Sequence, residues 1–209
     1  LQDMVSTIAK TNGIDHVIPL GPGATMHTDW LAAEACALPE PRPKSTDVAS
    51  LQYTGGTTGL PKGARHLHGS IVNMTRQIAW SWSEEPASNV WLDVAPQFHI
   101  WGLCMTALVP TYGRDTLVLI KQFRPDAVLH AIPRHKVTLF AGGPAPIFQA
   151  IMGHPEYKST DFSTLRLVGG GGSPFAEETI KAWEAVTGCS IHQGFGMSEA
   201  APLSLNPRH

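Results

Sequence analysis

Cysteine, charge and long apolar runs are all scarce in this sequence. Three of its 209 residues are cysteine (Cys36, Cys104 and Cys189) and no CxxC pair occurs, so we expect reduced and mostly buried thiols. Charged residues make up 15% of the chain and the formal net charge is −2, which argues against a nucleic-acid or polyanion surface. The apolar stretch at residues 101–109 is closed by Pro110 and is too short to span a bilayer. No basic and then apolar leader opens the chain, so we expect a cytoplasmic protein.

Histidine, by contrast, is more abundant than usual, with ten residues. His66 and His68 are two positions apart, so on a strand they would face the same way and could share a metal ion. No cysteine or carboxylate cluster nearby completes a ligand set, and the alternative is a strand end followed by a helix cap. The chain starts at Leu1 and stops within SLNPRH, which is typical of a loop, so we expect a piece of a longer protein.

Short apolar runs typical of strands alternate with helical stretches along the chain. Strands are predicted at residues 16–20, 48–53, 63–68, 90–95, 115–120, 137–142, 165–170 and 189–194. Helices are predicted at residues 28–37, 70–83, 100–111 and 124–136, after Pro146, and from Ser173 and Pro174, with Glu177 and Glu178 near the start of the last one. Because strands separated by helices need crossover connections, the pattern predicts an α/β fold with a mainly parallel β-sheet flanked by helices.

Two glycine clusters and a Pro-rich connector interrupt this alternation. The connector is at residues 40–47, the first glycine cluster lies within residues 53–63, and the second is at residues 169–172. Both clusters follow predicted strands, and open α/β sheets bind ligands at the carboxyl ends of their strands. We therefore expect both clusters to belong to a binding site.

The first cluster, YTGGTTGLPKG, combines bare backbone, hydroxyl groups and one cation. Glycine lets backbone N–H groups approach an anion, three threonines add hydroxyl donors, and Lys62 adds a full positive charge. Together these groups predict a cradle for the triphosphate of a nucleotide. A Walker P-loop does not fit, because Lys62 follows Pro61 and precedes Gly63. A flexible surface loop is the alternative, which the proline and lysine at its end disfavour.

This stretch resembles the phosphate loop of the adenylate-forming superfamily, which contains acyl-CoA synthetases, luciferase and the adenylation domains of peptide synthetases. The family pattern is an aromatic residue, then Thr/Ser-Ser/Gly-Gly-Thr/Ser-Thr-Gly-x-Pro-Lys-Gly, and every position fits. The next residues, ARHLHGSIVN, are similar to the family's strand and helix, with His68 at its usual histidine. The resemblance covers nearly all of residues 1–209 and is strongest to fatty-acid–CoA ligases. It implies that the chain is the central part of the family's large N-terminal domain.

A second segment, APQFHIWGL at residues 95–103, is similar to the family's substrate-site segment. The resemblance implies that His99 lies near the substrate carboxylate and Trp101 near the acyl pocket. Amino-acid-activating members usually carry aspartate where this chain has His99, and a neutral imidazole offers an ammonium group no counter-charge. We therefore expect an acid without an α-amino group. A hydrogen-bonded core histidine is the alternative interpretation of His99.

A third segment, LRLVGGGGSPF at residues 165–175, resembles the strand and loop that carry the adenine. The resemblance implies that Gly170, Gly171 and Gly172 form a flat wall for the base, and that Ser173 and Pro174 follow at its edge. A close packing turn between strand and helix is the alternative, and it is compatible with that role.

A fourth segment, HQGFGMSEAAP at residues 192–202, looks like the family's Gly-Tyr-Gly-x-Thr-Glu motif. The resemblance implies that Phe195, between Gly194 and Gly196, stacks on adenine. It also implies that Ser198 contacts the α-phosphate and that Glu199 holds Mg²⁺ through carboxylate oxygen. An ordinary helix cap is the alternative for the last two residues.

The family's reaction is the ATP-dependent activation of a carboxylic acid, here a fatty or aryl acid, to an acyl-adenylate, followed by thioester formation with coenzyme A. The resemblance implies that Lys62, Ser198 and Glu199 are catalytic. The chain stops before the family's ribose-binding aspartate, its hinge and the lysine of its mobile C-terminal domain, so we expect little activity from this polypeptide alone. The residues implied in ATP binding are Thr54, Gly55, Gly56, Thr57, Thr58, Gly59, Lys62, Gly170, Gly171, Gly172, Ser173, Pro174, Gly194, Phe195, Gly196 and Ser198.

Two other functions stay open at this point. One is an adenylation domain that loads the acyl group on a carrier protein instead of coenzyme A, and the other is a nucleotide-binding module that binds ATP without catalysis. The expected partners are a small carboxylic acid and coenzyme A, with no nucleic acid. Apolar surface exposed on a truncated domain could also form a homodimer.

Overall fold

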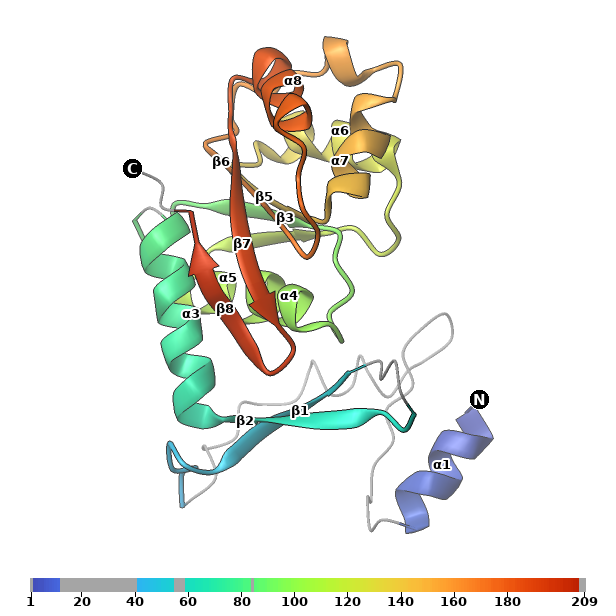
Figure 1. Ribbon diagram of the computed structural model, residues 1–209, viewed down its shortest axis with the longest axis vertical. Helices are drawn as coiled ribbons and strands as arrows, with labels where there is room; N and C mark the ends of the chain where they lie inside the picture. Colours follow the sequence, from blue (N-terminus) through green and yellow to red (C-terminus); the bar gives the residue numbers. More distant parts are fainter. Residues whose placement is uncertain (1, 12–40, 55–58, 84, 207–209) are drawn as a thin grey trace. The chain divides into compact units, whose positions relative to one another are not determined.

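The computed structural model describes residues 2–11, 41–54, 59–83 and 85–206 (Figure 1). The chain forms two compact units, Leu1–Arg42 and Pro43–His209, whose boundary lies in the Pro-rich connector. The smaller unit contains helix α1 (Gln2–Thr11). The strand expected at residues 16–20 and the helix expected at residues 28–37 lie outside the described residues. Among the described helices, none is both long and apolar enough to cross a membrane.

The larger unit is built on a six-stranded sheet with the order β4-β3-β5-β6-β7-β8. Its first five strands along the chain are parallel to their neighbours, and β8 is antiparallel to β7. The predicted α/β fold with a mainly parallel sheet is therefore confirmed. The strands are β3 (Val90–Asp93), β4 (Thr116–Leu119), β5 (Leu139–Gly143), β6 (Leu167–Gly171), β7 (Ile191–Met197) and β8 (Ala200–Leu205).

The expectation that the chain's last strand ends near residue 194 is wrong. Strand β7 continues to Met197, and a tight turn at Ser198 and Glu199 leads into β8. Strand β8 contains Pro202 and forms the edge of the sheet. Proline cannot donate a hydrogen bond to a sheet ladder, so a run with an internal proline is a weak strand signal that only an edge position tolerates.

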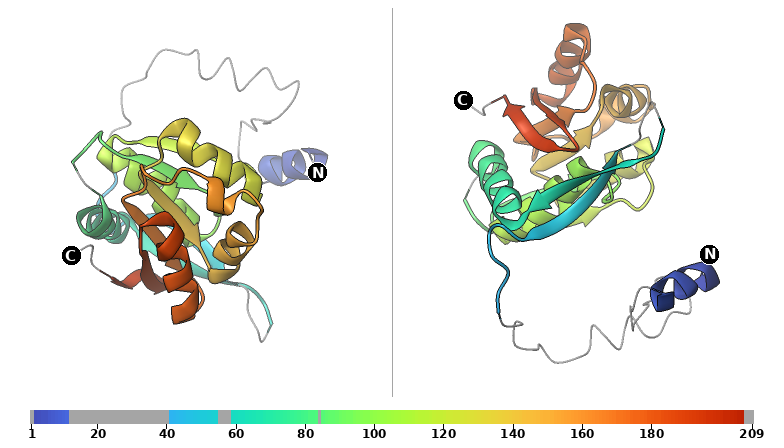
Figure 2. Two further views of the ribbon diagram at one scale, coloured as in Figure 1. Left: turned by 90° about the horizontal axis from the view of Figure 1, so that it is seen from above. Right: turned by 60° about the horizontal axis from the view of Figure 1, so that its bottom comes forward.

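Helices cover both faces of this sheet (Figures 1 and 2). One face carries α3 (His68–Trp82), α4 (Ile100–Gly102), the π-helix η1 (Leu103–Leu108) and α5 (Val109–Gly113), and the other carries α6 (Pro125–His135), α7 (Ala145–Met152) and α8 (Glu177–Thr187). Successive strand residues alternate between the two cores: Trp91, Leu139 and Leu167 pack with α3, whereas Leu92, Phe140 and Val168 pack with α6 and α7. Burial on both faces explains why β5 and β6 are apolar throughout and why β3 is apolar up to its last residue, Asp93.

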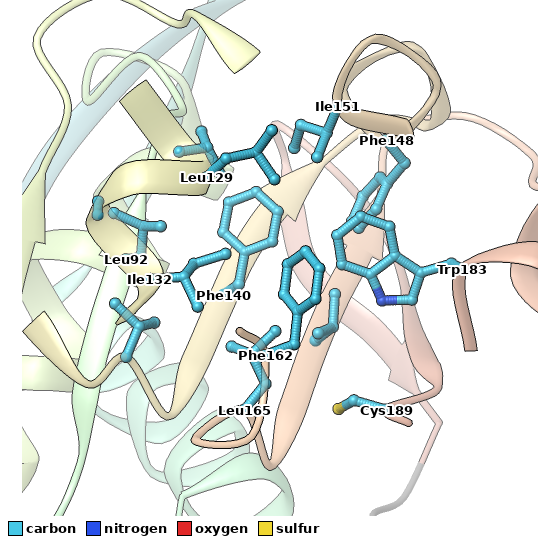
Figure 3. Packing of buried hydrophobic residues seen from close by; sticks show 14 of the residues in the cluster. Leu92, Leu129, Ile132, Phe140, Phe148, Ile151, Phe162, Leu165, Trp183 and Cys189 are labelled. Carbon is cyan, nitrogen blue, oxygen red and sulfur yellow. The ribbon is translucent and has the colours of Figure 1, made fainter. Parts of the chain in front are cut away.

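The core beneath α6, α7 and α8 is strongly aromatic (Figure 3). The fully buried Trp183 lies 5.0 Å from Phe148 and 6.4 Å from Phe140 between ring centroids, and Tyr157 and Phe162 complete the group. Burial raises the pKa of the Tyr157 hydroxyl to about 12, and this hydroxyl donates to the Trp183 carbonyl over 3.3 Å. This packed core holds the strands whose ends form the site described below.

Two predicted helices differ in detail from the observed ones. Residues 100–113 form three consecutive helical segments with a π-helix in the middle, not one α-helix. Helix α8 begins at Glu177, so the expectation that Ser173 and Pro174 start it is wrong. The Ser173 hydroxyl instead accepts a hydrogen bond of 3.2 Å from the Ala145 N–H. Glu177 and Glu178 do lie in the first turn of α8, where acidic side chains are favourable.

Strands β1 (Val48–Thr54) and β2 (Lys62–Leu67) form a separate antiparallel hairpin. The expectation that the first glycine cluster follows a strand of the parallel sheet is therefore wrong, because β1 does not belong to that sheet. Strand β2 leads directly into α3, as predicted. Cys104 and Cys189 are buried, as expected, and Cys36 lies outside the described residues.

Candidate functional site

A cavity of about 500 Å³ lies at the carboxyl ends of β3, β5, β6 and β7. Apolar side chains such as Val94, Ile100 and Ile147 line part of it, and the glycines that end β5 and β6 line another part. The short, bare strand ends leave the room for this cavity, since larger side chains there would fill it. This edge is the expected place for a ligand in an open parallel sheet.

A second cavity, of about 390 Å³, adjoins the first. Its lining includes Ser173, Gln193 and Asn206, so it is more polar than the first cavity. Gly172, Gly194 and Gly196 line both spaces. The two cavities therefore meet at glycines of the segments that the sequence singled out, and they could hold an apolar group and a polar group side by side.

His99 lines the larger cavity and is exposed. It is the N-cap of α4, and its Nδ1 accepts a hydrogen bond of 3.1 Å from the Trp101 N–H. The alternative interpretation of His99 as a buried core histidine is therefore wrong. Because Nδ1 accepts, the neutral ring carries its proton on Nε2, and that atom can donate to an anionic ligand.

The three glycines expected to form one wall have three different surroundings. A Cβ on Gly170 would lie 2.7 Å from the Phe175 ring, so Gly170 packs against the core and lines neither cavity. A Cβ on Gly171 would lie 2.4 Å from the Gly194 carbonyl oxygen and 2.8 Å from the Trp101 ring. Gly172 has a φ of +81° and open space around it. Of the three, only Gly171 and Gly172 line a cavity.

Ser198 and Glu199 form the turn between β7 and β8, so the alternative that they cap a helix is wrong. Ser198 is half-buried and lines the larger cavity, next to the glycines that both cavities share. Phe195 and Pro174 line the smaller cavity, and the Phe195 ring is 62% exposed at its rim. Ser198, Phe195 and Pro174 therefore lie around two adjoining cavities, and their roles stay a prediction.

Glu199 is exposed and lines neither cavity. Its carboxylate makes no ion pair with any residue that the structure describes, and carboxylate oxygen is the kind of ligand that Mg²⁺ prefers. Within the described ranges, no three or more His, Cys, Asp or Glu side chains form a metal-binding group. Glu199 therefore fits Mg²⁺ as a single protein ligand, with phosphate and water oxygens as the others.

Thr54 at the end of β1 pairs with Lys62 at the start of β2, at the end of the hairpin where the chain connects the two strands. Gly59 has a φ of +143°, which only glycine adopts readily. Lys62 is exposed, and neither it nor Thr54 lines a cavity in this conformation. The expected ligand residues Gly55, Gly56, Thr57 and Thr58 lie outside the described residues.

One contact that the sequence did not predict joins the hairpin to the site. His66 on β2 is 5% exposed, and its Nε2 donates a hydrogen bond of 2.6 Å to the Ser198 carbonyl. Figure 1 shows the hairpin passing beside the β7–β8 turn that Ser198 begins. Within the described ranges, neither His66 nor His68 belongs to a group of three or more His, Cys, Asp or Glu side chains that could hold a metal ion, so the structure does not support the metal pair. The hydrogen bond connects the strand that carries Lys62 with the turn that carries Glu199.

Replacing His66 with leucine should loosen this connection. Leucine retains apolar bulk but leaves the Ser198 carbonyl without its donor, at a cost of about 1–3 kcal/mol. We expect amide hydrogen exchange in β1 and β2 to become roughly tenfold faster, as measured by mass spectrometry. His135→Leu, at an exposed histidine in the last turn of α6, is the matched control. Equal hairpin protection in both variants would show that the contact does not hold the hairpin.

The sequence also did not single out Asp93, which ends β3 immediately before the cavity-lining Val94. Asp93 is fully buried, and neither carboxylate oxygen has a hydrogen-bond partner of normal geometry. Burial raises the pKa of this carboxyl to about 7, and the N–H groups of Ala95 and Val94 oppose the rise only in part. A central strand rarely ends in a buried, unpaired carboxyl group, and no periodicity signals it.

The sequence of this chain is similar to those of several curated proteins. The long-chain-fatty-acid–CoA ligase of Bacillus subtilis (strain 168) is 35% identical over 159 residues, which are 76% of this chain and 28% of that protein. The feruloyl-CoA synthase of an Amycolatopsis species is 39% identical over 169 residues, which are 78% of this chain and 33% of that protein. The chain thus spans about a third of the length of the curated relatives that it matches.

A solved structure and a family profile also match this chain. The crystal structure of ATP-bound MatB from Rhodopseudomonas palustris superposes with a TM-score of 0.84 at 26% identity, over 99% of this chain and 40% of that one. The profile described as "AMP-binding enzyme" matches residues 7–209, which is nearly the whole sequence. The chain therefore belongs to the AMP-binding enzyme family of adenylate-forming proteins.

Proposed function

We propose that this protein uses ATP to activate a carboxylic acid without an α-amino group, forming an acyl-adenylate that coenzyme A then converts to a thioester. The observation that carries the proposal is the pair of adjoining cavities, one mainly apolar and one more polar, which share a glycine-lined junction beside Ser198. A reaction that joins an acyl group to AMP needs two such sites in contact. Two relatives, named as a fatty-acid–CoA ligase and a feruloyl-CoA synthase, support a fatty or aryl acid.

In this proposal the smaller cavity holds the nucleotide. The exposed Phe195 ring stacks on the flat base, and Gly172 with its open surroundings lets the base or ribose approach the backbone. Gly194 and Gly196 on either side of Phe195 leave the junction open to the α-phosphate, where the Ser198 hydroxyl donates a hydrogen bond. The ATP in the MatB structure supports nucleotide binding by this fold.

The larger cavity holds the acid. His99 donates from Nε2 to the substrate carboxylate and orients it toward the junction, while the apolar lining surrounds the acyl group. Orientation matters here because a carboxylate is a weak nucleophile and must approach the α-phosphorus in line with the leaving pyrophosphate. The same imidazole offers no counter-charge to an α-ammonium group, which disfavours amino acids.

Charge stabilisation comes from the hairpin and from the β7–β8 turn. Lys62 and the phosphate loop hold the β- and γ-phosphates, and Glu199 is the residue that would hold Mg²⁺. When bound, this ion neutralises charge on the phosphate oxygens. The His66–Ser198 hydrogen bond links the strand that carries Lys62 to the turn that carries Glu199.

An ATP–pyrophosphate exchange assay on the full-length protein tests this proposal. Exchange should require an acid and occur with some members of a panel that contains alkanoic, aryl and amino acids, but not with the amino acids. Addition of coenzyme A or of a phosphopantetheinyl carrier protein then identifies the thiol acceptor from the thioester that forms. Absence of acid-dependent exchange across a broad panel would overturn the proposal in favour of a non-catalytic nucleotide-binding module.

A further inference from the structure

The indole of Trp101 lies across the glycine-rich ends of three neighbouring strands. A Cβ on Gly171 of β6 or on Gly194 of β7 would lie 2.8 or 3.1 Å from its Cζ3 atom, and one on Gly143 of β5 would lie 3.9 Å from its Nε1. The first two distances are too short for normal contact, so any side chain at Gly171 or Gly194 would displace the ring. The absence of side chains at Gly171 and Gly194 therefore leaves the space that the Trp101 indole fills.

A second tryptophan supports this ring from behind. Trp82 is 1% exposed, and its ring centroid lies 6.1 Å from that of Trp101 in an edge-to-face arrangement. The Trp82 indole is itself held by a hydrogen bond of 3.1 Å from Nε1 to the Asn206 carbonyl. The buried Nε1 of Trp101 has no hydrogen-bond partner, so packing alone holds Trp101. A phenyl ring could therefore replace the indole without losing a hydrogen bond.

Trp101 separates the larger cavity from a smaller apolar space. Beyond the ring is a void of about 30 Å³, roughly the volume of one water molecule, lined by Ile78, Cys104 and Met105. Trp101, Gly194, Gly196 and Ala201 line both this void and the 500 Å³ cavity, so they form the wall between them. The void borders the core that α3 and the π-helix η1 form. Removing the indole would join the two spaces into one deeper pocket.

We propose that Trp101 is the floor of the acyl pocket and limits the length of the acid, so that this protein activates compact acids, either short-chain or single-ring, and not long-chain fatty acids. This inference rests on the proposed function, because it assigns the larger cavity to the acyl group. A chain that continues toward the core would have to push Trp101 off Trp82 and the glycines. Overall identity does not decide this point, since one relative is named for long-chain acids and another for a single-ring acid.

If Trp101 is the floor of the pocket, the affinity of the protein for an alkanoic acid should stop rising at a defined chain length. Each methylene buried in an apolar pocket contributes about 0.8 kcal/mol, which is roughly a fourfold gain in affinity. This gain should continue until the chain reaches the indole and then stop. With the floor removed, the same gain should continue into the space next to Ile78 and Met105.

The test is a series of linear alkanoic acids from four to sixteen carbons, with cinnamate as a single-ring acid, on the full-length protein. Binding of each radiolabelled acid is measured by equilibrium dialysis, and ATP–pyrophosphate exchange is measured in parallel. The wild type should show a cut-off length, and it should bind cinnamate. Trp101→Ala should move the cut-off by at least two methylenes, which is roughly a sixteenfold gain for the first acids beyond the wild-type limit.

Trp101→Phe is the matched control, since it retains an aromatic floor and should keep the cut-off within one methylene of the wild type. Trp101→Leu provides a second open variant if the alanine variant does not fold. Affinity that rises to sixteen carbons in the wild type, or one cut-off shared by all variants, would overturn the floor while leaving acid activation intact. If no acid binds or supports exchange in any variant, the proposed function fails and the inference fails with it.

Discussion

Replacing Lys62 with alanine should lower acid-dependent ATP–pyrophosphate exchange by about 100-fold or more. Lys62 begins β2 at the end of the hairpin where the two strands are connected, directly opposite Thr54, and its ammonium group makes no ion pair with any residue that the structure describes. In our proposal it stabilises charge that builds up on the phosphates during adenylate formation. Losing one such preorganised donor typically costs about 10²–10³ in rate. The measurement is the initial exchange rate of the full-length variant at saturating acid.

Lys158→Ala is the matched control for this variant. Lys158 is an exposed lysine in the short 3₁₀-helix at Tyr157–Ser159 and belongs to no part of the site, so its loss should leave the exchange rate unchanged. The hairpin pairing of Lys62 is a backbone feature, and circular dichroism should show both variants folded to the same extent. If Lys62→Ala exchanges pyrophosphate within twofold of the wild type, Lys62 has no catalytic role and the phosphate cradle must be formed by other groups.

Replacing Asp93 with asparagine should remove a large pH dependence of stability. The pKa of Asp93 is raised from 3.8 to about 7 in the folded protein because its carboxyl is fully buried. The folded chain therefore holds a proton at pH values where the unfolded chain has released it. The stability contribution of this group is fully present below about pH 4 and is lost as the pH rises through about 7. A rise of this size corresponds to roughly 4 kcal/mol.

Urea unfolding at pH 4 and pH 8 measures this effect. Between these two pH values the wild type should lose about 4 kcal/mol more in free energy of unfolding than Asp93→Asn does, since asparagine does not ionise. Asp161→Asn is the control, because a hydrogen bond from the Ser163 hydroxyl lowers the pKa of that exposed carboxyl, and a lowered pKa cannot cause a loss of stability as the pH rises. Parallel pH profiles of the wild type and Asp93→Asn would show that the buried carboxyl finds a partner when it ionises.

Much of the fold followed from local pattern in the sequence. The apolar runs that became β3 to β7 alternate with stretches that became α3, α6, α7 and α8, and this order alone implied a parallel sheet with crossover helices. The boundaries were right to within a few residues wherever a strand is buried on both faces. Local pattern failed where pairing partners decide the structure: β1 pairs only with β2, and β8 is an edge strand that contains Pro202.

In the candidate site, too, some features could be predicted from local sequence and others could not. The motif residues could be recognised from sequence because each of them lies in its own short segment of backbone, as the glycines, the turn at Ser198 and the N-cap His99 do. Sequence could not assign different surroundings to Gly170 and Gly171, because these depend on Phe175 and Trp101, which arrive from other parts of the chain.

By itself, then, the sequence determined the fold class, the family and the short segments that form the site, because periodicity and motif chemistry are local properties. Only the tertiary structure decided that Trp101 lies between the larger cavity and the core, that His66 joins the hairpin to Ser198, and that the carboxylate of Asp93 is buried without a hydrogen-bond partner of normal geometry. Each of these depends on groups far apart in the chain. Side-chain packing at the ends of the parallel strands brings them together, and burial there sets both the pocket depth and the pKa.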